Sequence, residues 1–112
     1  MKKRALISIL VIVLVVLLAI ILLNQKKPET PEEIAQCIGK NSVLYIQLGC
    51  HACESQEELF GDSYQYLTII DCFYEHDKCL AAEVTGTPTW VIKGEKYIGT
   101  RTIQKLQELT GC

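Results

Sequence analysis

Hydrophobic and polar positions divide the chain into two unequal parts. Residues 5–23 form 19 uncharged positions in a row, and Ser8 is the single polar side chain among them. A helix of that length spans about 28 Å, close to the roughly 30 Å hydrocarbon core of a bilayer. The apolar region of a signal peptide is shorter, about 7–15 residues, and precedes a small-residue cleavage site that residues 22–25 lack. The pattern favours a transmembrane anchor over residues 1–24, with a cleaved signal peptide as the alternative.

The rest of the chain alternates between short apolar runs and amphipathic stretches. Residues 25–31 are polar with two prolines and predict a linker, which leaves 32–112 as one small domain. Strands are expected at 43–48, 66–71, 89–92 and, after a turn, 96–98. Helices are expected from a Thr30 cap to 38, over 50–60, over 78–84, and from a Thr102 cap to 109.

This order of elements predicts the fold class. Strands joined through a helix should run parallel, whereas the last two strands form an antiparallel hairpin. The domain is therefore expected to be α/β, with a mixed four-stranded sheet flanked by helices. Cys50-x-x-Cys53 directly after the first strand is the arrangement that thioredoxin-like domains have.

The charge and the cysteine content of the domain indicate on which side of a membrane it lies. Residues 28–112 carry six Lys and Arg against 13 Asp and Glu, a formal charge of −7, and no basic patch, so nucleic-acid binding is not expected. Basic residues 2–4 before the apolar run outnumber the two lysines after it, which favours an N-terminus inside the cell. Six cysteines in so small a domain are typical of disulfides in an oxidising compartment. The domain is thus expected on the extracytoplasmic side of a cell membrane.

The Cys50-His51-Ala52-Cys53 motif carries the candidate chemistry. At a helix start, unpaired N–H groups and the helix dipole stabilise a Cys50 thiolate, which is the nucleophile. Cys53, one turn on, can resolve a mixed disulfide, and a protonated His51 would further favour the thiolate. A structural disulfide and a zinc site recruiting Cys72, Cys79 or a histidine are the alternatives, but the spacing is not that of a zinc site. We therefore predict a redox site with no metal and no cofactor.

The other four cysteines predict two further bridges. Cys72 and Cys79 would close a short loop, either as a structural staple, worth about 2.5 kcal/mol, or as a second redox pair. Cys37 and Cys112 would tie the two ends of the domain, worth about 4 kcal/mol in the same chain-entropy model. Because six cysteines allow about 15 pairings, this connectivity is a preference among alternatives.

Several motifs together resemble one family. They are Tyr45, Cys50–Cys53, Glu58-Leu59-Phe60-Gly61, Cys72 and Cys79, Gly86-Thr87-Pro88-Thr89-Trp90-Val91-Ile92, Gly94-Glu95-Lys96-Tyr97-Ile98-Gly99 and Leu109-Thr110-Gly111-Cys112. These residues, within 34–112, resemble the thioredoxin-like domain fused to or partnered with bacterial and archaeal vitamin K epoxide reductase homologues. Members commonly have Trp before the first cysteine and Pro-His between the two, where this chain has Gly49 and His51-Ala52. Many thioredoxins also keep a buried carboxylate at the position of Leu44.

The resemblance implies a site and a partner. A cis Pro88 would face the cysteines and shape the substrate groove, and the main chain of Thr87 would pair with an extended substrate peptide. Electrons from substrate thiols would then pass to a membrane quinone reductase of the vitamin K epoxide reductase type. The expected function is a membrane-anchored thiol–disulfide oxidoreductase that oxidises protein thiols. A reductase or isomerase of the same fold, or a non-catalytic metal- or protein-binding module, are the alternatives.

Overall fold

The N-terminal segment forms one long helix. The computed structural model describes residues 1–25 and 30–112. Helix α1 (Lys2–Leu23) is long and apolar enough to cross a membrane, and its side chains are exposed along its whole length. A signal sequence close to the N-terminus can have the same length and apolar composition. The predicted linker 25–31 falls mostly on residues 26–29, which lie outside the described residues.

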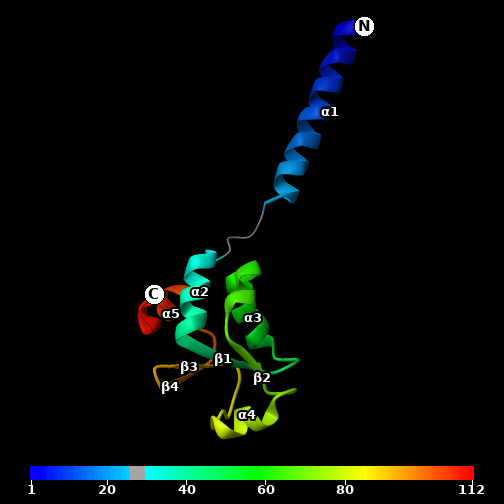
Figure 1. Ribbon diagram of the computed structural model, residues 1–112. Helices are drawn as coiled ribbons and strands as arrows, with labels where there is room; N and C mark the ends of the chain where they lie inside the picture. The colour runs from blue at the N-terminus through cyan, green and yellow to red at the C-terminus, as the bar shows by residue number, and fades with distance from the viewer. Residues whose placement is uncertain (26–29) are drawn as a thin grey trace.

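Residues 30–112 form a four-stranded sheet with helices packed on it (Figure 1). In chain order the elements are α2 (Glu32–Asn41), β1 (Ser42–Ile46), α3 (His51–Phe60), the 3-10 helix η1 (Gly61–Tyr66), β2 (Ile69–Asp71), α4 (His76–Ala81), β3 (Thr89–Ile92), β4 (Glu95–Ile98) and α5 (Ile103–Thr110). The strand order is β2-β1-β3-β4. The mixed α/β sheet flanked by helices is as predicted from the sequence.

The direction of β3 differs from the sequence-based prediction. β1 and β2 are parallel, as expected for strands joined through α3, but β3 runs antiparallel to β1 and therefore to β2. Helix α4 has six residues, about 9 Å of helix, and Figure 1 shows it beyond the end of the sheet where β2 stops. Because so short a connection does not carry the chain back along the sheet, β3 begins at the end where β2 finishes.

One hydrophobic core joins the sheet to α2, α3 and α5. Leu44 of β1 and Trp90 of β3 are register partners, and neither has exposed surface. The ring of Phe60 from α3 lies 6.1 Å from that of Trp90. Further members from the helices and strands are Ala35, Ile38, Leu67, Ile92 and Leu106. Leu44 thus fills with hydrocarbon the position where many thioredoxins have a carboxylate.

Two element boundaries also differ from the predictions. Thr30 does not cap α2: its hydroxyl donates to the carbonyl of Leu59 at 2.7 Å, and its own carbonyl accepts from the Ser63 hydroxyl at 2.6 Å. The stretch predicted as strand 66–71 begins as η1, so that only Ile69–Asp71 pairs with β1. Thr30 therefore belongs to the folded domain, attached at the C-terminal end of α3.

Candidate redox site

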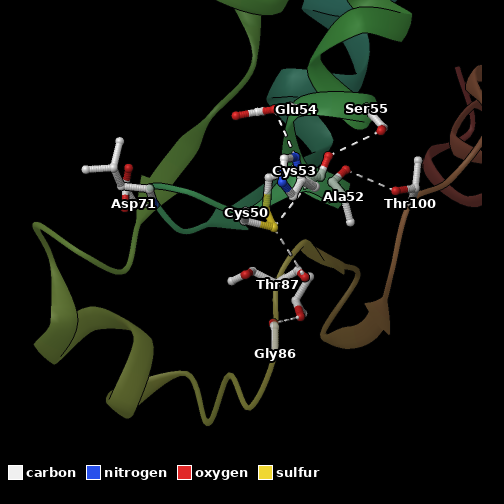
Figure 2. Close-up of a disulfide and its surroundings, with 12 residues drawn as sticks. Cys50, Ala52, Cys53, Glu54, Ser55, Asp71, Gly86, Thr87 and Thr100 are labelled. Carbon is white, nitrogen blue, oxygen red and sulfur yellow. Dashed lines mark hydrogen bonds and ion pairs between the residues drawn. A yellow bond between two sulfur atoms is a disulfide. The ribbon is translucent and has the colours of Figure 1, made fainter.

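Cys50 occupies the N-cap position of α3. Its backbone is extended (φ −87°, ψ 112°), and its sulfur accepts a hydrogen bond from the Cys53 N–H, with 3.1 Å between Cys53 N and Cys50 Sγ. The two residues form a disulfide with their Cα atoms 5.2 Å apart (Figure 2). When that bond opens, the same N–H group and the helix dipole stabilise negative charge on Cys50.

The two sulfurs differ in accessibility. Cys53 is 5 % exposed and belongs to the buried face of α3, whereas Cys50 is partly exposed. An external thiolate can therefore reach Cys50 and not Cys53. This is the division between attacked and resolving cysteine that disulfide exchange through a mixed disulfide needs.

The loop before β3 lies against Cys50. The Thr87–Pro88 bond is cis, and the Thr87 carbonyl oxygen lies 3.6 Å from Cys50 Sγ. A dashed line in Figure 2 marks this contact. Pro88 is fully buried, and its carbonyl accepts from the Gly99 N–H at 2.7 Å, which fixes it beside β4. Thr87 is partly exposed. The fold thus brings the residues predicted for substrate binding next to the cysteines; their binding roles stay predictions.

The His51 side chain lies in solvent beside Glu54. Its side chain is 98 % exposed, and its Nδ1 lies 3.5 Å from the Glu54 carboxylate, an ion pair when the imidazole is protonated. A His51 charge would be partly offset by that carboxylate before it acted on Cys50. The predicted effect of His51 on the thiolate therefore rests on an exposed side chain that already has an acidic partner.

An acidic hollow adjoins the disulfide. It has a volume of about 170 Å³, and its lining includes both cysteines together with Glu54, Glu57, Tyr64 and Asp71. Burial, together with the negative charges of Glu57 and Asp71, raises the pKa of Tyr64 to about 12. The carboxylates thus make the electrostatic potential at the sulfurs more negative than the helix start alone would make it.

Gln56 is a supporting residue that the sequence-based reasoning missed. It has no exposed surface; its Oε1 accepts from Trp90 Nε1 at 3.0 Å and from Arg101 N at 2.7 Å, while its Nε2 donates to Arg101 O at 3.0 Å. Its spacing from Cys53 and Phe60, three and four residues, puts it on the buried face of α3. This spacing could have identified Gln56 from the sequence, because a polar side chain on the buried face of a helix needs hydrogen-bond partners in the core.

The other four cysteines form the two preferred pairs. Cys37 of α2 joins Cys112, with Cα atoms 5.9 Å apart, and Cys72 joins Cys79 of α4 at 5.7 Å. The first pair connects the start of the domain to its last residue. The second closes the loop between β2 and α4 at the sheet end where Cys50 also lies. The structural or redox role of each pair stays a prediction.

Sheet order, the cysteine pair at the start of α3 and the facing cis-proline loop define a thioredoxin-like fold. No protein-family profile matches the sequence. Among solved structures, the chain is similar to the NTD_N/C domain of alkylhydroperoxide reductase AhpF from Enterococcus faecalis (V583), with 14 % identity and a TM-score of 0.47. The match covers 75 % of this chain but only 45 % of that structure. At the level of the class, the thioredoxin-like fold and the Cys50–Cys53 disulfide are those of a thiol–disulfide oxidoreductase.

Proposed function

We propose that this chain is a membrane-anchored oxidase of protein thiols that acts on the extracytoplasmic side. The observation that carries the proposal is the Cys50–Cys53 disulfide at the start of α3, with one accessible sulfur, one buried sulfur and the Thr87 main chain beside them. The Cys53 N–H aimed at Cys50 Sγ supports this direction of electron flow, because stabilising a Cys50 thiolate favours the reduced form of the pair.

The chemistry proceeds in two exchanges. A substrate thiolate attacks Cys50 Sγ, the Cys50–Cys53 bond breaks, and Cys53 leaves as a thiolate that takes up a proton. A second substrate thiolate then attacks the substrate sulfur of the mixed disulfide and releases Cys50. The substrate gains a disulfide, and the site gains two electrons and two protons. Thr87 would hold the substrate strand in register with Cys50 through its main chain.

Trapping substrates tests this proposal. With Cys53→Ala, the Cys50 thiolate can attack the disulfide of an oxidised substrate, which is the reverse of the last exchange, and releases the other substrate thiol. No Cys53 is present to break the resulting mixed disulfide, so mixed disulfides should accumulate in cells and be cleaved by reducing agent. The matched control is Cys50→Ala, which leaves the buried Cys53 and should trap nothing. Absence of trapped species with Cys53→Ala would sink the enzymatic proposal.

A second candidate, a reductase or isomerase of the same fold, is favoured by the acidic hollow. Three carboxylates line it, and His51 is paired with one of them, so negative charge opposes a thiolate at the site. The reduction potential of the Cys50–Cys53 pair separates the candidates: about −120 mV is typical of an oxidase and about −270 mV of a reductant. Titrating the full chain against glutathione and dithiothreitol buffers gives this value.

The location and the electron acceptor are parts of the same proposal. Helix α1 supports a single-pass anchor, and the basic residues before it favour a domain outside the cytoplasm. A reporter that is active only outside the cytoplasm, fused after Cys112, should be active; an inactive reporter would contradict this topology. A vitamin K epoxide reductase-like quinone reductase is the proposed acceptor, and co-expressing one should keep Cys50–Cys53 oxidised in cells.

A further inference from the structure

The disulfide between Cys72 and Cys79 lies at the same end of the sheet as the Cys50 site. The Cys72 N–H donates to the Ile46 carbonyl at 2.7 Å, which fixes Cys72 beside the last residue of β1, four positions before Cys50. A hollow of about 160 Å³ is lined by Cys72, Cys79, His76 and Thr87. Thr87 thus faces Cys50 through its carbonyl oxygen and also borders the hollow at the second disulfide.

This second pair repeats the asymmetry of the first. Cys79 is 3 % exposed and buried against the domain, whereas Cys72 is partly exposed. His76, in the first turn of α4 and three residues before Cys79, supplies a titratable side chain to the same hollow. One reachable sulfur with a buried partner is the arrangement that exchange through a mixed disulfide uses, and a nearby imidazole can pass a proton to the leaving thiolate.

Hydrogen bonds also hold the loop that this disulfide closes. The Asp71 carbonyl accepts from the N–H groups of Tyr74 and Glu75, at 3.1 and 2.8 Å, and Asp71 Oδ1 accepts from the Phe73 N–H at 2.9 Å. Lys78 and Glu75 add an ion pair. The turn thus has covalent and non-covalent supports together, so opening the disulfide leaves the others in place.

We propose that Cys72–Cys79 is a second redox-active disulfide that exchanges with the same class of substrate, protein dithiols in extended segments lying along Thr87. A substrate thiolate attacks Cys72 Sγ, the Cys72–Cys79 bond breaks, and Cys79 leaves as a thiolate and takes up a proton. A second substrate thiolate then attacks the substrate sulfur, forms the substrate disulfide and releases Cys72, which is protonated in turn. Two electrons and two protons move from substrate to the pair. The proposal rests on the proposed function and extends it to two electron pairs per domain.

Redox titration of the full chain in detergent tests the proposal for each disulfide separately. The protein is equilibrated with graded glutathione and dithiothreitol redox buffers, its free thiols are alkylated, and mass spectrometry of peptides counts each open pair. We expect Cys72–Cys79 to open with an equilibrium constant within about 100-fold of that of Cys50–Cys53, or about 60 mV. Cys37–Cys112 should stay closed throughout that range.

The outcomes distinguish this proposal from the proposed function. If Cys72–Cys79 stays closed after Cys50–Cys53 has opened, or opens only together with Cys37–Cys112, it is a structural bridge and the second centre is overturned. If Cys50–Cys53 resists reduction while Cys72–Cys79 opens, the proposed function fails and the second centre stands.

An activity measurement tests whether Cys72–Cys79 is redox-active in a protein that lacks the Cys50–Cys53 pair. The double variant Cys50→Ala with Cys53→Ala keeps Cys72–Cys79 and should still oxidise a synthetic extended peptide that carries two cysteines. Its rate should be at least tenfold above that of a quadruple variant that also has Cys72→Ala and Cys79→Ala. Equal rates would contradict the proposal, and circular dichroism of both variants confirms that they are folded.

Discussion

At the scale of single residues, Gln56 shows how one side chain supports the site. The hydrogen bonds of its side chain go to Trp90 and to the main chain of Arg101. Gln56→Leu keeps the size but leaves those groups without partners, so the free energy of unfolding should fall by roughly 2–4 kcal/mol. Urea unfolding followed by the fluorescence of Trp90 measures this.

The control for Gln56 lies on another helix. Gln104 in α5 is exposed, so Gln104→Leu should change the free energy of unfolding by no more than about 0.5 kcal/mol. Equal losses in the two variants would mean that the hydrogen bonds of Gln56 contribute nothing specific.

Tyr64 makes stability depend on pH in the alkaline range. Burial, then Glu57 and Asp71, raise its pKa from 10.0 to about 12, so the folded state keeps the phenol proton at a pH where the unfolded chain releases it. The stabilisation is complete below pH 10 and is lost as pH rises towards 12. Unfolding free energies measured across this range should fall more steeply for the natural chain than for Tyr64→Phe. Parallel curves for the two chains would contradict the assignment.

At the scale of elements, α2 and η1 lie close together at Gly39. A Cβ at that position would overlap the Tyr66 carbonyl oxygen and lie 3.1 Å from Leu67 Cα. Alanine is by itself a better helix former than glycine by about 1 kcal/mol, so helix propensity alone would make Gly39→Ala stabilising. A loss of stability would instead show that the close packing dominates. We expect Gly39→Ala to destabilise the domain by about 1–3 kcal/mol in thermal unfolding.

A neighbouring position provides the comparison for Gly39. Lys40→Ala, one residue on and exposed, should leave the melting temperature nearly unchanged. A rise in melting temperature with Gly39→Ala would show that α2 and η1 can separate without cost.

The same close contact explains part of what sequence reasoning could not foresee. Strand β3, the hairpin to β4 and the Thr102 cap of α5 follow from local pattern and turn residues, and all three are present. The expected strand 66–71 begins only at Ile69, because Tyr66 instead ends η1, which packs on α2, and this packing is a tertiary effect. The direction of β3 likewise depends on how short α4 is. In the site, the motif predicted Cys50 and Cys53, but the acidic hollow is assembled from residues distant in sequence.

At the scale of the whole molecule, two disulfides close loops of very different length. Cys37–Cys112 spans 75 residues and Cys72–Cys79 spans seven. Replacing both cysteines of the long-range pair by serine should cost about 4 kcal/mol, against about 2.5 kcal/mol for the short-range pair. Denaturation of the two double variants tests the order. Equal losses would show that loop length does not control the stabilisation.

Attachment of the chain at Thr30 has a mechanical consequence. Thr30 is hydrogen-bonded to residues at and just after the C-terminal end of α3. Cys50 caps the opposite end of this ten-residue helix, which is about 15 Å long. The reactive sulfur therefore lies one length of α3 from the point where the described chain enters the domain. If α1 anchors the chain, rotation of the domain about Thr30 moves Cys50 along an arc whose radius is the length of α3.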